Sequence, residues 1–207
     1  MKVVTFAAQK GGVGKTTLAV NIAVAASARG TRTALFDLDP QESATAWSER
    51  RSNDDPHIEP ISARRLGQAI EAARAAGFDF AIIDTPPAAG SEAAEAAQRA
   101  DLVIIPCRPS LVDLDAIKTT AQLIASTGRP GVVVLNAAPP TATALIKDAC
   151  LLVRETGLDV ASTIIRERSA YRAAWPLGQG VIEYEPSGKA ATEIASLLDF
   201  IFDKLQT

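Results

Sequence analysis

The residues from Lys10 to Thr17 read KGGVGKTT, and their types and spacing suit the binding of a phosphate chain. Glycines let backbone N–H groups converge on phosphate oxygens, because no Cβ stands in the way. Lys15 can reach the β- and γ-phosphates, the Thr16 hydroxyl can bind Mg²⁺, and Thr17 can hydrogen-bond further back along the chain. The loop residues predicted to hold phosphate are Gly11, Gly12, Val13, Gly14, Lys15, Thr16 and Thr17.

A predicted strand precedes this loop and a predicted helix follows it. The run from Val3 to Ala8 is mostly apolar, and the stretch from Thr17 to Ala28 is rich in small, helix-forming residues. A glycine turn between a strand and a helix directs the first N–H groups of the helix at a bound anion. The flanking elements therefore favour a phosphate site over a glycine-rich turn without a ligand.

The start of the loop departs from the usual pattern G-x-x-x-x-G-K-[ST]. Gln9 occupies the position of the first glycine, and a second lysine, Lys10, follows it. This deviant form of the Walker A motif resembles that of the ParA/MinD group of ATPases. The resemblance implies that Lys10 contacts ATP held by a partner subunit, and that ATP brings two subunits together as a homodimer.

Two aspartates end the second predicted strand, in the string DLDPQ. Alternation along an extended strand places Asp37 and Asp39 on the same side. The string resembles the second nucleotide-contacting motif of ParA proteins, which implies that Asp39 orients the attacking water and that Asp37 belongs to the Mg²⁺ neighbourhood. The alternative is that these carboxylates cap the next helix. The predicted catalytic residues are thus Lys10, Lys15 and Asp39.

A third aspartate, Asp84, follows an apolar run in the string IIDTPP. Four apolar residues and an aspartate form a Walker B pattern, whose carboxylate holds Mg²⁺, usually through a water. The DTPP string resembles the switch that follows Walker B in the same family. The predicted metal-site residues are Thr16, Asp37 and Asp84.

Two later strand ends complete the predicted site. From Pro106 to Asp113, the pattern P-x-x-P-S-x-x-D is similar to the loop that ParA proteins place beside the nucleotide and the dimer face. Asn136 stands where the family reads the edge of adenine, and its amide offers both a donor and an acceptor. The alternative is a turn asparagine that caps the next segment. No N-K-x-D pattern of GTPases begins at Asn136, so ATP is favoured over GTP.

Arginines gather after the last predicted strand. Arg166 matches the position that binds non-specific DNA in ParA proteins, and Arg168 and Arg172 lie nearby, with Glu167 opposing them. Such a patch can neutralise phosphates without reading bases. The chain has 24 acidic and 21 basic residues, a formal charge of -3, which argues against strong, uniform nucleic-acid binding but not against a local patch. The alternative is an ordinary solvated face with surface ion pairs.

The elements that position these residues alternate between short apolar runs and longer helical ones. Strands are predicted over 2–8, 33–38, 79–84, 102–106, 131–136 and 160–165, and helices over 15–29, 41–51, 64–76, 90–99, 113–127, 141–156, 169–175 and 188–205. Continuously apolar strands indicate an α/β fold, a mainly parallel twisted sheet with helices on both faces. We expect a single P-loop ATPase domain over 1–207, with each motif at the carboxyl end of a strand. His57 is expected in an exposed loop.

The resemblance covers Lys2 to about Leu205 and points to the short ParA class, which lacks an N-terminal helix-turn-helix. It implies a cytoplasmic, nucleoid-associated ATPase that uses ATP and Mg²⁺, binds DNA non-specifically and segregates or positions cargo. A centromere-binding or cargo-adaptor partner would stimulate hydrolysis, which is expected to be slow alone, because no arginine finger is evident near the loop.

Two other interpretations stay open: a MinD-like membrane-associated regulator, and a metabolic or electron-transfer ATPase on the same scaffold. The segment from Ala195 to Leu205 carries two acids and one lysine, so we expect a core-packing helix there and no membrane contact.

Overall fold

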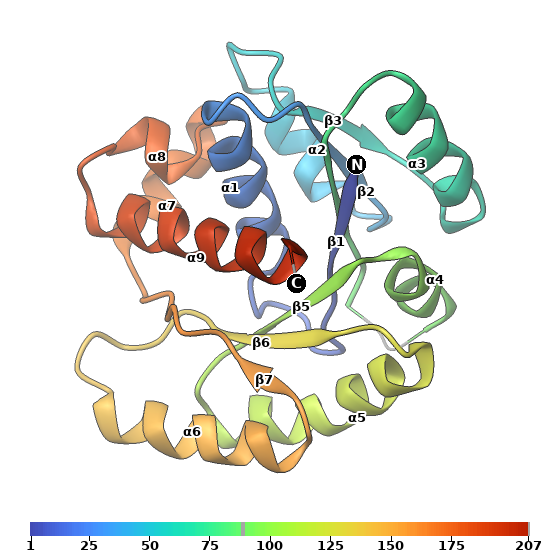
Figure 1. Ribbon diagram of the computed structural model, residues 1–207. Helices are drawn as coiled ribbons and strands as arrows, with labels where there is room; N and C mark the ends of the chain where they lie inside the picture. Colours follow the sequence, from blue (N-terminus) through green and yellow to red (C-terminus); the bar gives the residue numbers. More distant parts are fainter. Residues whose placement is uncertain (88–89, 207) are drawn as a thin grey trace.

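A parallel sheet forms the centre of the computed structural model, which describes residues 1–87 and 90–206 (Figure 1). Within this part of the chain the sheet has seven strands, in the order β3-β2-β4-β1-β5-β6-β7. Every neighbouring pair is parallel, so the strands all end at one edge of the sheet. The strands are β1 (Lys2–Phe6), β2 (Thr33–Asp37), β3 (His57–Pro60), β4 (Phe80–Asp84), β5 (Leu102–Cys107), β6 (Gly131–Leu135) and β7 (Asp159–Val160).

Helices cover both faces of this sheet (Figure 1). One face carries α1 (Lys15–Ala28), α2 (Ser43–Ser48), α7 (Ser169–Ala174), α8 (Val181–Tyr184) and α9 (Lys189–Gln206). The other carries α3 (Leu66–Ala75), α4 (Ser91–Arg99), α5 (Leu111–Thr127) and α6 (Thr143–Glu155). The turns η1 (Ala63–Arg65) and η2 (Trp175–Leu177) precede α3 and follow α7. The predicted fold class is confirmed.

Alternate strand residues supply the two halves of the core. In β1, Val4 and Phe6 pack with α1 and α9, whereas Val3 packs with α3. Burial on both faces explains why the central strands are continuously apolar. The last helix, α9, buries Ile194, Leu198 and other side chains in the first cluster, so the prediction of a core-packing helix is confirmed.

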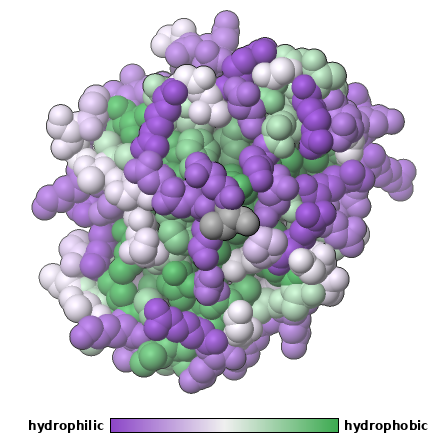
Figure 2. All heavy atoms as spheres, in the orientation of Figure 1, coloured by the Kyte–Doolittle hydropathy of each residue, from purple (hydrophilic) through white to green (hydrophobic). Residues whose placement is uncertain are grey.

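One face of the surface around this core is shown in Figure 2. Figure 2 shows hydrophilic side chains projecting over most of one face, with hydrophobic surface visible between them. In the part of the chain that the structure describes, no helix is both long enough and apolar enough to cross a membrane.

The structure corrects two strand predictions at the outer edges of the sheet. The edge strand β3 was not predicted, because its polar ends interrupt the apolar pattern of a strand. His57 is exposed as expected, but it lies in this strand and not in a loop. The strand predicted over 160–165 is wrong beyond β7. The N–H groups of Ala161 and Ile165 still donate to Val133 and Leu135 of β6, at 2.8 and 2.9 Å. Between these two hydrogen bonds the chain advances by four residues, from 161 to 165, whereas β6 advances by only two. The segment is therefore out of register with β6.

Candidate nucleotide-binding site

The P-loop joins the end of β1 to the start of α1, at the edge where the strands end. Gly14 is the N-cap of α1 and has a φ of 94°, in the left-handed region that favours glycine. A Cβ at this position would stand 2.2 Å from Nδ2 of Asn136. Gly14 is therefore required both by its backbone conformation and by the close approach of Asn136.

Lys15 begins α1 inside the site and is 6% exposed. Burial lowers the pKa of its ammonium group, and the nearby carboxylates of Asp84 and Asp39 partly offset this effect. The structure thus brings the predicted phosphate-binding lysine together with two of the predicted acidic residues, from three different strand ends.

Asp84 is the end residue of β4 and is completely buried. The pKa of its carboxyl group is raised to about 7, mainly by burial and also by the charges of Asp37 and Asp39, against the opposing effects of Thr16 and Lys15. Thr16 approaches the carboxylate, but neither oxygen of Asp84 has a well-formed hydrogen bond within residues 1–87 and 90–206. Buried polar groups normally have partners, so this carboxylate is suited to receive one from a ligand.

Mg²⁺ fits this donor set. The ion takes oxygen ligands and is usually held by one or two protein groups, with phosphates and waters completing its shell. The described residues contain no cluster of three or more histidine, cysteine or acidic side chains that could hold a metal alone. Asp84 and the Thr16 hydroxyl are the oxygen donors that this arrangement would supply.

Asp37 has a structural role in addition to its place beside Asp84. Its Oδ2 accepts hydrogen bonds from the backbone N–H groups of Ala44 and Thr45, both at 3.0 Å, at the start of α2. Burial nevertheless raises the pKa of Asp37, and the bonds from Thr45 and Asp39 act against this. In the structure Asp37 therefore caps the start of α2, which is the alternative that the sequence left open. A role of Asp37 toward Mg²⁺ stays a prediction.

Asp39 lies half-buried just beyond β2. Its Oδ1 accepts a hydrogen bond from the N–H of Gln41 at 2.9 Å, which holds the turn that leads to α2. Its charge acts on both Lys15 and Asp84. The predicted water-orienting carboxylate is therefore next to the phosphate-binding lysine.

Lys10 lies at the front of the loop and forms an ion pair with Asp113 of α5. Ser110 is the N-cap of α5 and also bonds to Asp113 through its hydroxyl. The Lys10 side chain is 39% exposed, in contrast to the buried Lys15. The two lysines of the motif thus have opposite surroundings.

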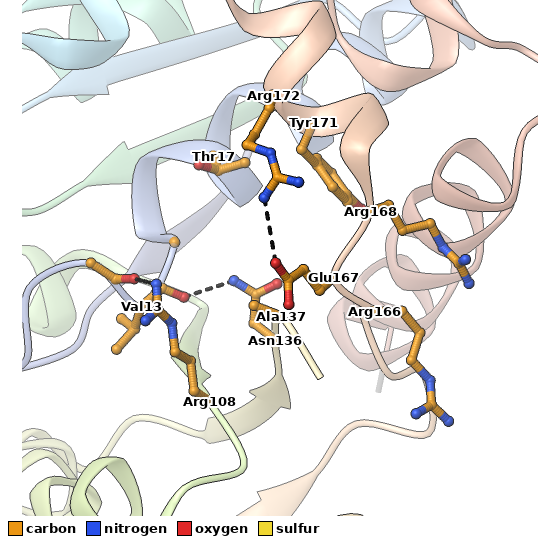
Figure 3. A pocket seen from close by; sticks show the side chains of 12 residues that line it. Val13, Thr17, Arg108, Asn136, Ala137, Arg166, Glu167, Arg168, Tyr171 and Arg172 are labelled. Carbon is orange, nitrogen blue, oxygen red and sulfur yellow. Dashed lines mark hydrogen bonds and ion pairs between the residues drawn. The ribbon is translucent and has the colours of Figure 1, made fainter. Parts of the chain in front are cut away.

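A pocket of about 360 Å³ opens beside the second half of the loop (Figure 3). Asn136 stands at its wall, and its Nδ2 donates to the Val13 carbonyl at 2.7 Å. This bond leaves the carboxamide oxygen of Asn136 without a donor among the residues described. The pocket is lined by Gly12, Val13, Gly14, Thr17, Arg108, Asn136, Ala137, Arg166, Glu167, Arg168, Tyr171 and Arg172.

The three predicted DNA-binding arginines line this same pocket. Arg168 pairs with Glu193 and is 26% exposed, and Arg172 pairs with Glu167 at 3.4 Å on the surface. Arg166 donates to the Pro139 carbonyl at 2.9 Å and points away from the loop in Figure 3. The patch is therefore partly neutralised, and its three arginines line the pocket that the loop residues Gly12 to Gly14 also line.

Arg108 and Asp113 were missed as functional residues. The guanidinium of Arg108 donates to the Gly12 carbonyl, so an arginine of the same chain lies beside the loop, where the sequence had shown no evident arginine finger. Both residues belong to the P-x-x-P-S-x-x-D string, which the resemblance already placed beside the nucleotide. That string was the available signal, but nothing in it says which side chains turn toward the loop.

Comparison with known proteins shows the family of this chain. Residues 4–175 match the family model described as the CobQ/CobB/MinD/ParA nucleotide binding domain. The Maintenance of carboxysome distribution protein A of Gloeobacter kilaueensis is 33% identical over 187 residues, 89% of this chain and 84% of that protein. The protein of the same name from Halothiobacillus neapolitanus is 29% identical over 206 residues, 92% of this chain and 91% of that protein.

Solved structures show the same fold. The MinD cell division protein of Aquifex aeolicus superposes with a TM-score of 0.79 at 18% identity, over 98% of this chain and 97% of that one. The matched family model spans the P-loop, the acidic strand ends and the arginine cluster. The chain therefore belongs to the CobQ/CobB/MinD/ParA nucleotide-binding family, within which it is similar to ParA- and MinD-type P-loop ATPases.

Proposed function

We propose that this protein is a Mg²⁺-dependent ATPase that dimerises on ATP and uses this cycle to segregate or position a cargo on DNA. The observation that carries the proposal is the contrast between the two lysines of the loop. Lys15 is buried beside Asp84 and Asp39, where a bound phosphate chain would meet it. Lys10 is half-exposed and paired with Asp113, so it is available to a phosphate held by a second copy once that pair opens.

The loop would bind the phosphates of ATP through its backbone N–H groups, Lys15 and Thr17. A bound Mg²⁺ would supply positive charge that offsets the charge of the phosphates. Asp84 and Thr16 would hold the ion, and Asp37 adds negative charge behind Asp84. Asn136 would read the adenine edge, since its Nδ2 is engaged by Val13 and its oxygen can accept from the N6 amine.

Hydrolysis would depend on Asp39, which has one carboxylate oxygen in the Gln41 turn and can use the other to orient water. Lys15 and the loop N–H groups would stabilise charge on the transferring phosphoryl group. We expect turnover well below the roughly 1–10³ s⁻¹ of typical enzymes, because Lys10 stays with Asp113 until a second copy docks. A partner protein and DNA would raise the rate.

The ATP-bound dimer would bind DNA of any sequence through Arg166, Arg168 and Arg172, and would associate with the nucleoid in the cytoplasm. The two relatives described above are named for carboxysome distribution, which supports a protein assembly as one class of cargo, beside a plasmid or chromosome. An adaptor or centromere-binding protein would link this cargo to the dimer and stimulate hydrolysis.

Light scattering with Mg²⁺ and either ATP or ADP tests the proposal. The slowed variant Asp39→Ala should be a dimer with ATP and a monomer with ADP. Lys10→Ala should lose the dimer but keep nucleotide binding, whereas Lys15→Ala should weaken binding itself. Lys118→Ala, an exposed lysine on α5, is the matched control and should behave as the parent. A monomer that persists at saturating ATP would contradict the dimer.

A further inference from the structure

Arg108 stands beside the P-loop because of the strand order. It directly follows β5, and β5 pairs with β1, whose end leads into the loop. The register pairs Phe6 with Ile104, so β5 continues for three more residues beyond the last residue of β1, to Cys107. This overhang brings residue 108 level with the tip of the loop.

The backbone that presents Arg108 is firmly held. Its carbonyl accepts hydrogen bonds from the N–H of Ser110 at 2.8 Å and from Sγ of Cys107 at 3.2 Å. Pro109 is buried next to it, and α5 starts two residues later under its Ser110 cap. The exposed side chain of Arg108 is therefore presented from a rigid turn, as a ligand-binding group needs to be.

The guanidinium of Arg108 reaches the pocket without an acidic partner. It donates to the Gly12 carbonyl, and Figure 3 shows it beside Val13 at the pocket wall. Its positive charge lowers the pKa of Asp113, but that carboxylate is engaged by Lys10, whose hydrogen bond is a larger cause of the shift. No ion pair of Arg108 occurs within the described ranges, whereas Arg168 and Arg172 are paired with glutamates.

We propose that Arg108 is a phosphate-contacting residue, whose guanidinium donates to the phosphate chain of a nucleotide bound in the P-loop of the same subunit. This inference rests on the proposed nucleotide site and adds a residue to it. A guanidinium has several N–H donors in a fixed fork, so one can stay on Gly12 while others meet phosphate oxygens. An unpaired cation at an anion cradle contributes a charge-assisted hydrogen bond, which is stronger than a neutral one.

A purely structural role predicts a different outcome, because Arg108 would then only brace the loop through the Gly12 carbonyl. Arg108→Gln keeps a neutral donor for that carbonyl and removes the charge. Arg108→Lys keeps the charge. Arg129→Gln removes an exposed arginine just before β6, at the opposite edge of the sheet, and is the matched control.

Binding of ATP with Mg²⁺ is measured by calorimetry at low and high salt, about 0.05 and 0.5 M. We expect Arg108→Gln to bind ATP about tenfold or more weakly than the wild type at low salt. The difference in affinity should be smaller at high salt. Arg108→Lys should stay within a few-fold of the wild type, and Arg129→Gln should equal it.

Equal affinity of wild type and Arg108→Gln would overturn the inference. The inference would also be overturned if the difference in affinity between wild type and Arg108→Gln were the same at both salt concentrations. An Arg108→Lys variant that binds ATP as weakly as Arg108→Gln would overturn it too, because the positive charge would then not contribute to binding. A wild type that binds no ATP would instead overturn the nucleotide site itself, and the inference with it.

Discussion

Asp84 shows most directly how a single residue responds to the site around it. It ends a strand that is buried along its whole length, so its carboxylate is withdrawn from water as completely as the valines and isoleucines nearby. Among the described residues neither oxygen has a well-formed hydrogen bond, and the charges of Asp37 and Asp39 raise its pKa. An ionised Asp84 is therefore unfavourable in the protein alone, and a bound cation would stabilise it.

The stability of the protein should depend on pH because the pKa of Asp84 is raised in the folded state. The pKa of Asp84 rises from 3.8 to about 7 on folding, so the folded protein holds the proton more tightly than the unfolded chain. The contribution of this group to stability is therefore present at low pH and is lost as pH rises from about 4 to about 7. Without Mg²⁺ and nucleotide, Asp84→Asn should unfold at about the same free energy as the wild type at pH 4. At pH 8 it should be more stable by on the order of 4 kcal/mol.

Denaturant unfolding at several pH values measures this difference. Asp115→Asn, whose side chain is 80% exposed, serves as the control and should follow the wild type throughout. Curves for Asp84→Asn and wild type that run parallel from pH 4 to pH 8 would show that Asp84 titrates normally.

At the scale of elements, Arg51 ties the segment after α2 to the C-terminal helices. Its side chain is 4% exposed and bonds to the Gly178 carbonyl at 2.8 Å and to both carboxylate oxygens of Glu183. It also lies over the ring of Trp47, 4.9 Å from the centroid, and Trp47 packs against Trp175. The segment from Trp47 to Arg51 is thus connected to the one from Trp175 to Glu183.

Arg51→Ala should lower the free energy of unfolding by about 3 kcal/mol, because it removes the ion pair with Glu183 and leaves the Gly178 carbonyl without its donor. The neighbouring Arg50 is exposed, so Arg50→Ala should change stability by less than about 0.5 kcal/mol. Denaturant unfolding of both variants makes the comparison. Equal effects of the two substitutions would mean that the Arg51 contacts add nothing measurable.

At the scale of the whole molecule, charge limits how DNA can be bound. The chain carries a formal charge of -3, and Glu167 and Glu193 offset two of the three arginines in the proposed patch. One copy therefore presents a weak phosphate-binding surface. Two patches on an ATP-bound dimer would double the number of phosphate contacts, and counterion release would make binding steeply dependent on salt.

Retention of DNA should accordingly require ATP and be independent of sequence. Arg172 is exposed and loosely paired, so Arg172→Ala and Arg166→Ala should each make the plot of log affinity against log salt shallower, by about 0.9 per lost phosphate contact. Arg129→Ala should leave the slope unchanged. Gel shifts of Asp39→Ala with ATP, over a range of salt, measure these slopes. If the ATP-bound protein does not bind DNA and sediments with anionic liposomes, the interpretation as a membrane-associated regulator would be favoured.

Much of this architecture could be predicted because it depends on short stretches of sequence. The central strands were predicted to within one or two residues, since burial on both faces leaves a continuous apolar run. The edge strand β3 and the segment after β7 could not be, because exposure on one side breaks that run. The short helix α8 was missed for a similar reason, as it has four residues and only Val181 is buried.

What the sequence determined by itself is the chemistry and its order: a phosphate loop with two lysines, then carboxylates and an amide at successive strand ends. Only the tertiary structure decided how these groups are used. Arg108 reaches Gly12, Asn136 holds Val13, Arg168 pairs with Glu193, and Asp37 binds the start of α2. The first three contacts join residues far apart in the chain, and each depends on strand order, register and the direction of a side chain. Strand order, register and side-chain direction cannot be predicted from local sequence, because a motif specifies which groups are present and the fold specifies their neighbours.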